Sequence, residues 1–324
     1  MANDDHDSKP APIVSSQRKG VAVLGSFVAD LTFRAGRMPR LGETLVGSSF
    51  AMGPGGKGSN QAVAAARVGA DVTLLSSVGK DAFGEVARAC WSREGIVTRV
   101  TQSEKAPTGA AFIYVNDQTG ENAIIVTLGA SATISVGEVE AAADAIRGAA
   151  VFVTQLEQPV AAARRGLEIA KSAGVVTVFN PAPAESFEDA FYGLTDYITP
   201  NETEAAALTG VAIRSIDDAR RAGDTLLAKG VGTALITLGA SGALFHRRDV
   251  SVALPAFDAG AVVETAGAGD AFTGGFAAAL ARGLPPLEAA RFASVVAGIS
   301  VTRPGTAPSM PSLAEVESRM AANR

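Results

Sequence analysis

Short apolar runs rich in β-branched residues alternate with alanine-rich stretches along most of this chain. The apolar runs predict buried strands at residues 21–25, 72–78, 151–154, 175–179, 197–199 and 234–238. The alanine-rich stretches predict helices at residues 59–68, 83–94, 160–172 and 216–229. Because alternating strands and helices form βαβ units, the pattern predicts an α/β fold in which helices cover both faces of a mostly parallel sheet.

Two further segments, at about residues 31–50 and 110–127, are strand-like and have no helical stretch between their strands. They predict a small antiparallel sheet, inserted into the main domain, that covers its open end as a lid. Residues 1–19 have neither a basic start nor an apolar core, so they predict a flexible N-terminal tail and not a signal peptide. We expect residues 20–324 to form one α/β domain together with its lid.

Composition excludes several classes of function. The 324 residues are 47% hydrophobic, enough for one large α/β core or two modest ones. The net charge is −5 without a dense lysine or arginine cluster, so we expect no nucleic-acid partner. Cys90 is the only cysteine, and His6 and His246 are the only histidines, which disfavours disulfides, thiolate metal sites and histidine-based catalysis. No apolar run reaches transmembrane length, so we expect a cytoplasmic protein without membrane contact.

A small-residue turn at residues 264–270 carries the strongest chemical signal. It follows a strand-like stretch at residues 261–263 and opens a predicted helix at residues 271–280. Backbone N–H groups of Gly267, Ala268 and Gly269 can converge on an anion there, and the helix dipole adds positive potential. A permanent carboxylate would repel a phosphate, so Asp270 is best interpreted as a base that deprotonates an attacking hydroxyl. The alternative is that Asp270 only caps the helix.

A glycine-rich turn at residues 53–60 precedes another predicted helix. It fits the loose pattern G-x-G-x-x-G, but it does not follow the first strand, and Asp71 lies before the next strand instead of at its end. A phosphate-binding loop of the Walker type would need Ser or Thr where Gly58 follows Lys57. What remains is a turn that presents Lys57 and Asn60 to a polar ligand, or simply a helix start.

These two turns resemble the two motifs of the PfkB carbohydrate kinase family, and within it the chain is similar to the ribokinases. The similarity runs from about residue 21 to the end of the chain. Further matching segments are residues 24–26, 39–44, 61–66, 155–157, 180–184, 199–204 and 236–239. The resemblance implies a ribokinase-like α/β fold and ATP-dependent phosphorylation of the primary 5-hydroxyl of a pentose. D-ribose, giving ribose 5-phosphate, is the leading substrate.

Several alternatives stay open at this point. The substrate could be 2-deoxyribose or, less favoured, a ketohexose or nucleoside. A non-catalytic sugar- or nucleotide-binding regulator would be expected to lack Asp270 or the anion-hole glycines, and both are present. An NAD-linked oxidoreductase is disfavoured by the position of the glycine turn.

The resemblance also implies a role for individual residues. Asp270 is the base, and Gly267, Ala268 and Gly269 form the anion hole. The sugar is held by Asp30, Gly56, Lys57, Asn60, Glu157 and Asp270. The nucleotide is bound by Asn201, Thr237, Gly239, Gly242, Gly269 and Ser294. Asn201 and Glu204, three residues apart at a predicted helix start, bind Mg²⁺ through water, and the alternative for this pair is a helix cap.

Two positions depart from the ribokinase pattern. Val28 stands where ribokinases typically have Asn, two residues before Asp30, and an aliphatic side chain cannot bond a sugar hydroxyl. Glu264 stands where the family usually has an Asp that helps to bind an activating K⁺, and one extra methylene moves the carboxylate by roughly 1.5 Å. The other positions implied for this cation are Ala266, Ser300, Arg303, Gly305 and Ser309. The resemblance finally implies a homodimer joined through the lid sheets.

Overall fold

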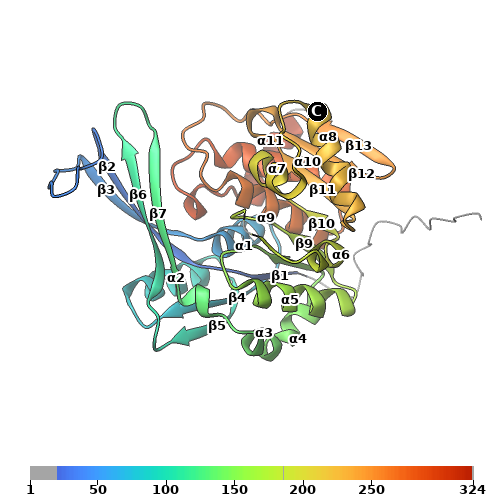
Figure 1. Cartoon of the computed structure of the whole chain (residues 1–324), viewed down its shortest axis with the longest axis horizontal. Helices are drawn as coiled ribbons and strands as arrows, with labels where there is room; N and C mark the ends of the chain where they lie inside the picture. Colours follow the sequence, from blue (N-terminus) through green and yellow to red (C-terminus); the bar gives the residue numbers. More distant parts are fainter. Residues whose placement is uncertain (1–19, 185, 323–324) are drawn as a thin grey trace, which may run out of the picture.

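A large sheet with helices on both faces forms the body of the protein (Figure 1). The computed structural model describes residues 20–184 and 186–322, so the tail expected at residues 1–19 lies outside the described part. Within that part the sheet has nine strands in the order β13-β12-β11-β10-β9-β8-β1-β4-β5. Their bounds are β1 Val21–Leu24, β4 Val72–Gly79, β5 Val97–Ser103, β8 Val151–Thr154, β9 Val176–Phe179, β10 Tyr197–Ile198, β11 Thr233–Thr237, β12 Ala243–Arg247 and β13 Val250–Leu254.

All pairings from β11 to β5 are parallel, and only β12 and β13 run antiparallel at one edge. One hydrophobic core lies between the sheet and the helices α1, α2, α9, α10 and α11. A second core lies on the opposite face, beneath α3 to α8. The predicted α/β fold, a mostly parallel sheet with helices on both faces, is therefore confirmed.

The helices follow the alanine-rich stretches closely, because alanine is a strong helix former and lets helices approach the sheet. Their bounds are α1 Lys57–Arg67, α2 Ala82–Arg93, α3 Val136–Ala141, α4 Ala143–Gly148, α5 Val160–Ser172, α6 Ala190–Leu194, α7 Glu202–Thr209, α8 Ile216–Ala228, α9 Ala268–Ala281, α10 Pro286–Ser300 and α11 Leu313–Ala322. Short 3₁₀ turns lie at η1 Ala130–Thr133, η2 Gly239–Ser241 and η3 Ala307–Ser309. None of the helices in the described residues is long and apolar enough to cross a membrane.

A small four-stranded sheet projects from one side of the body (Figure 1). It has the order β3-β2-β6-β7, with bounds β2 Val28–Ala35, β3 Ser49–Gly55, β6 Thr108–Asn116 and β7 Asn122–Gly129. The β2–β3 and β6–β7 pairs are antiparallel, whereas β2 and β6 run parallel where the two pairs join. Strand β2 begins at Val28, so Val28 and Asp30 lie on this sheet and, two residues apart, point to the same face.

The chain before α9 differs from the sequence-based expectation. Residues 261–263 are not a strand: Val262 and Val263 are exposed, and the Val263 N–H bonds the carbonyl of Val301 at the end of α10. The prediction was wrong because no neighbouring strand is available to pair with this valine run. Helix α9 also starts three residues earlier than predicted, with Gly267 as its N-cap in the left-handed region at φ 78°.

Candidate active site

A cavity of about 130 Å³ brings the two glycine-rich motifs together at the carboxyl ends of the central strands. Lys57 reaches it from the start of α1, and the start of α9 contributes Gly267 to Asp270. The remaining lining residues follow β9 or β10, end β11 or precede α9. They are Asn180, Ala182, Thr199, Asn201, Glu204, Thr237 and Thr265. A cleft of this kind, at the switch between strands, is the usual ligand site of an open α/β sheet.

Asp270 is buried in the first turn of α9, and its carboxylate is held on both sides. Asn60 donates its side-chain amide to Oδ2 at 3.0 Å, and Gln61 donates to Oδ1 at 2.9 Å. Gly267 is the N-cap, and no side chain caps this helix. Asp270 is therefore not the helix cap that was its alternative interpretation. The carboxylate is directed at the glycine-rich turn instead. At the nearby start of α9 the Ala268 N–H bonds the carbonyl of Thr265, whereas the N–H groups of Gly267 and Gly269 donate to no carbonyl of the described residues.

Glu157 and Asp30 lie on the other side of the first motif. Glu157 accepts hydrogen bonds from the backbone N–H of Lys57 and from the hydroxyl of Ser26. The Asp30 carboxylate lies directly against Gly55, where a Cβ would come within 2.3 Å of Oδ2. A glycine is thus required at position 55 so that the carboxylate can fit beneath the turn.

The pKa of Asp30 is unusually high for an aspartate. Burial raises this pKa to about 6, a hydrogen bond from Thr306 opposes the rise, and the charges of Glu157, Glu264 and Asp270 add to it. Several carboxylates therefore converge here, as expected for a site that accepts hydrogen bonds from hydroxyl groups.

Lys57 provides positive charge within this acidic surrounding. Burial lowers the pKa of its amine, but Asp270, Glu157 and Glu204 outweigh that effect and leave the pKa above its ordinary value. The amine therefore stays protonated near neutral pH. Among the described residues it forms no ion pair within 4.0 Å, so it can interact with an anion that enters the cavity.

Asn201 and Glu204 form the helix cap of α7 that their spacing allowed. Asn201 Oδ1 accepts the N–H of Glu204, and Glu204 Oε2 accepts the N–H of Asn201. Burial raises the pKa of Glu204, opposed by the Asn201 N–H and by Lys57. Glu204 Oε1 accepts no hydrogen bond from the described residues, and the side chain lines the cavity. Capping and metal binding are therefore compatible for this pair.

The positions expected for a monovalent cation lie around the loop that follows α10. The Glu264 carboxylate accepts the N–H of Gly305 at 2.8 Å, so its longer side chain reaches this loop. The hydroxyls of Ser300 and Ser309 donate to carbonyls within their own turns. The carbonyl oxygens of Ala266, Arg303 and Gly305 accept no hydrogen bond from any described residue. Free carbonyls and a carboxylate are the oxygen donors that an alkali cation requires.

Three predicted nucleotide residues lie outside the cavity lining. Ser294 is on α10, where its hydroxyl donates to the carbonyl of Ala290. Gly239 begins η2, and Gly242 follows that turn. Thr237, by contrast, lines the cavity, and its backbone forms an isolated parallel β-bridge with Asn201.

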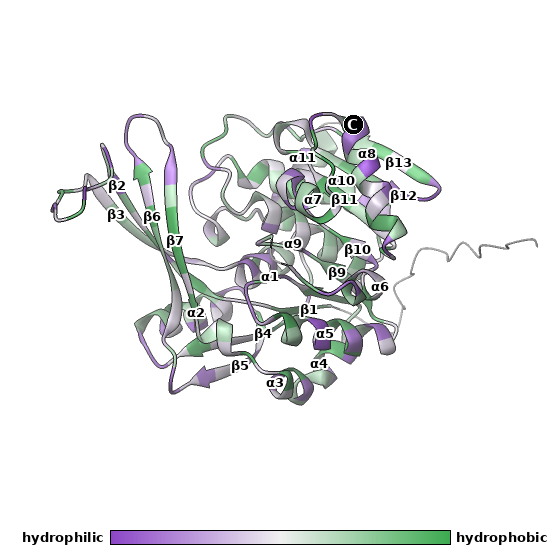
Figure 2. Ribbon diagram, in the orientation of Figure 1, coloured by the Kyte–Doolittle hydropathy of each residue, from purple (hydrophilic) through white to green (hydrophobic). Residues whose placement is uncertain are grey.

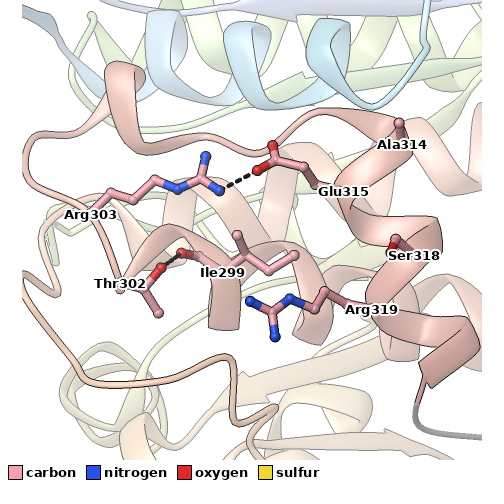
Figure 3. A pocket seen from close by; sticks show the side chains of 7 residues that line it. All are labelled: Ile299, Thr302, Arg303, Ala314, Glu315, Ser318 and Arg319. Atoms are coloured by element: carbon pink, nitrogen blue, oxygen red, sulfur yellow. Dashed lines mark hydrogen bonds and ion pairs between the residues drawn. The ribbon is translucent and has the colours of Figure 1, made fainter.

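A second, larger cavity of about 320 Å³ lies between the ends of α10 and α11 (Figure 3). Of the predicted site residues it includes only Arg303, which pairs with Glu315 across it. It contains no part of the Asp270 network.

Sequence reasoning missed four residues that hold the predicted groups in place. Gln61 bonds Asp270, Asn180 and Gln155 at once, and Asn180 bonds the carbonyl of Thr199. Ser26 bonds Glu157, and Thr306 bonds Asp30. Gln61, Asn180 and Ser26 belong to segments that matched the family pattern, and that match could have drawn attention to them. Thr306 lies in no motif and had none.

Comparison with known proteins agrees with this geometry. Residues 18–313 match the profile of the pfkB family carbohydrate kinases, and the chain belongs to this family. It is thus a sugar kinase, as predicted. A ribokinase of Haemophilus influenzae is 40% identical over 299 residues, which cover 92% of this chain and 97% of that protein. A deoxyribokinase of Salmonella typhi is 37% identical over 307 residues, or 94% and 99% of the two chains.

The fold of the chain also agrees with that of a solved ribokinase structure. The structure of Arabidopsis thaliana ribokinase complexed with ribose and ATP superposes with a TM-score of 0.86 at 28% identity, covering 94% of this chain and 99% of that one. The ribokinase-like fold is therefore confirmed.

Proposed function

We propose that this carbohydrate kinase transfers the γ-phosphoryl group of ATP to the primary 5-hydroxyl of a pentose, with D-ribose as the leading substrate. The observation that carries the proposal is the Asp270 carboxylate. It is buried at the N-terminus of α9, held by Asn60 and Gln61, and faces the cavity that both motifs line. A base next to the N–H groups of a helix start suits phosphoryl transfer to an alcohol.

In this mechanism the sugar lies between the glycine-rich turn and the small sheet. Asp30, Gly56, Lys57, Asn60 and Glu157 hold its hydroxyl groups. The Oδ1 of Asn60 is buried without a hydrogen-bond partner among the described residues, so a sugar hydroxyl is a suitable donor to it. Glu157, fixed by Ser26 and the Lys57 N–H, retains a second oxygen for the same purpose.

Asp270 takes the proton of the primary hydroxyl as the sugar oxygen bonds to the γ-phosphorus and the bond to the bridging oxygen of ADP breaks. The N–H groups at the start of α9, from Gly267 to Gly269, stabilise the charge on the transferred group. Asn201, Thr237, Gly239, Gly242, Gly269 and Ser294 bind the nucleotide. The Lys57 amine adds positive charge near Asp270.

The residues present fit a magnesium ion that accompanies ATP. The Glu204 carboxylate belongs to a residue that lines the cavity, and Mg²⁺ usually combines one or two protein carboxylates with phosphate and water. When bound, Mg²⁺ would neutralise phosphate charge. A K⁺ ion is the expected activator, held by Glu264, Ala266, Ser300, Arg303, Gly305 and Ser309 beside the anion hole.

The small sheet is proposed to act as a lid and to join two copies of the chain. Phe33, Phe50, Met52 and Ile125 are each at least 41% exposed. The strand register places them on one face, and the ring centroids of Phe33 and Phe50 lie 4.9 Å apart with the rings tilted by 46°. Figure 2 shows hydrophobic stretches along β6 and β7. A small sheet with an apolar second face gains stability by burying that face in a homodimer.

The runner-up substrate is 2-deoxyribose. Val28 is buried on the same strand face as Asp30 and has no polar atom for a sugar hydroxyl. This observation favours weak discrimination at the hydroxyl that the two sugars do not share.

A coupled assay of ADP release tests the function. It is run over ribose, 2-deoxyribose, fructose, tagatose and adenosine, and we expect the highest kcat/KM for one of the two aldopentoses. Preference for a hexose or for adenosine would overturn the pentose assignment. Failure of every sugar to stimulate ADP release would overturn the proposed reaction.

A further inference from the structure

Thr306 lies where the sugar side, the anion hole and the cation loop meet. Its hydroxyl is 3.0 Å from Asp30 Oδ2 and 3.1 Å from the carbonyl oxygen of Pro54. Its side chain also packs on Gly267, where a Cβ would be only 3.3 Å from Thr306 Cβ and 3.5 Å from Cγ2. One residue thus contacts the sugar-facing sheet and the helix cap of α9.

The backbone on both sides of Thr306 is fixed. The N–H of Gly305 bonds Glu264, and the Thr306 carbonyl accepts hydrogen bonds from the N–H and the hydroxyl of Ser309. The hydroxyl is therefore presented to Asp30 by a rigid turn and not by a freely rotating loop. The β-branched side chain adds to this, because its methyl group against Gly267 selects one rotamer.

We propose that Thr306 is a positioning residue for the sugar: its hydroxyl holds the Asp30 carboxylate as an acceptor for sugar hydroxyls. The inference rests on the proposed sugar-kinase function, in which Asp30 binds the substrate. Asp30 Oδ1 accepts no hydrogen bond from the described residues, so it stays available while Thr306 occupies Oδ2.

The charges around Asp30 explain why this hydroxyl matters. Burial and the carboxylates of Glu157, Glu264 and Asp270 all raise the pKa of Asp30, and the Thr306 hydrogen bond is the interaction that lowers it. Lys57 on α1 does not offset this rise, because the carboxylates that influence its amine are Asp270, Glu157 and Glu204 and not Asp30. Without the Thr306 hydroxyl, Asp30 would therefore be protonated at a higher pH and would lose an acceptor.

The test compares Thr306→Val, which keeps the shape and removes the hydroxyl, with Thr306→Ser, which keeps the hydroxyl. Thr302→Val is the matched control, because the Thr302 hydroxyl donates only to the carbonyl of Ile299 within its own turn. For each variant, kcat and KM for the preferred pentose are measured between about pH 5.5 and pH 8.5.

Loss of a hydroxyl donor to a carboxylate raises its pKa by about one unit. Starting from a pKa of about 6, Thr306→Val should raise KM about fivefold at pH 6 and less than twofold at pH 8, with kcat nearly unchanged. Thr306→Ser and Thr302→Val should follow the wild-type profile.

Two results would overturn the inference. One is a Thr306→Val profile that coincides with the wild type at every pH. The other is equal impairment of Thr306→Ser and Thr306→Val, because packing of the methyl group on Gly267 would then be the cause. A wild-type enzyme that no sugar stimulates would instead contradict the proposed function itself.

Discussion

Replacing Asp270 with Asn should remove catalysis while leaving the fold almost intact, for a reason visible in the hydrogen bonds. In the wild type both carboxylate oxygens accept amide N–H groups, from Asn60 and Gln61. An Asn side chain at 270 would turn one acceptor into a donor and place two donors face to face. Gln61 cannot rotate to relieve this conflict, because its Oε1 accepts the Gln155 amide.

Asn60 can relieve the conflict. Its Oδ1 has no hydrogen-bond partner among the described residues, so rotation of the amide by 180° offers this oxygen to the new NH₂ group. Both hydrogen bonds at position 270 then persist, and the variant should lose less than about 1 kcal/mol of unfolding free energy. Asp270→Ala is the matched contrast. It leaves two buried amide donors without acceptors, at about 1–3 kcal/mol each.

The catalytic effect should be much larger. A general base contributes about 10²–10⁴-fold, equivalent to about 2.7–5.5 kcal/mol of activation free energy. The assay is sugar-dependent ADP release at saturating ATP, beside thermal unfolding of the wild type and both variants. An Asp270→Asn enzyme within tenfold of the wild-type kcat would refute the base assignment. An Asp270→Asn variant as unstable as Asp270→Ala would refute the argument about Asn60.

Three further predictions concern the sugar, the cation and the dimer. Val28→Asn should shift the ratio of the kcat/KM values for ribose and 2-deoxyribose towards ribose by about 10-fold or more, because it restores a hydrogen-bonding group worth about 1.4 kcal/mol. An unchanged ratio would show that Val28 does not determine the choice between the two sugars. Turnover should be higher in KCl than in NaCl or a large organic cation, though weakly because Glu264 replaces the usual Asp, and equal rates in all three salts would contradict cation activation. Ile125→Glu should produce monomers in sedimentation analysis, whereas Val97→Glu, an exposed apolar site on β5, should not; a dimer that survives Ile125→Glu argues against the lid interface.

Strands and helices with a strong hydrophobic periodicity could be predicted from the sequence. Whether an apolar run finds a partner strand could not be predicted. Alternating apolar and alanine-rich stretches located β1, β4, β8, β9, β10 and β11 and the helices α1, α2, α5 and α8, because each of these segments buries a continuous face. They did not locate the parallel strand β5, which is mostly exposed and has no apolar run. The valine run at residues 261–263 has the same composition but lies beside the end of α10. A strand needs a partner strand, and single-sequence patterns do not reveal pairing.

In the active site, too, features with a local sequence signal could be predicted, and contacts between distant residues could not. Asp270 and the two glycine turns carry a local signal, because an anion site needs small residues before a helix. The bond from Thr306 to Asp30 joins residues 276 positions apart, and nothing near Thr306 in the sequence indicates it. For Asn201 and Glu204 the sequence allowed a helix cap or a metal site. The structure shows the cap, which uses Oε2 of Glu204, and Glu204 is also one of the residues that line the cavity.

The central claim is that Asp270 activates the primary hydroxyl of a pentose for attack on ATP. The most direct measurement compares D-ribose with 5-deoxy-D-ribose, which lacks only that hydroxyl, in the ADP-release assay, and identifies the product by ³¹P NMR. The account predicts rapid ADP formation and ribose 5-phosphate from D-ribose, and only background ATP hydrolysis with 5-deoxy-D-ribose. Equal ADP release with both sugars, or a phosphate on any other oxygen of ribose, would contradict it.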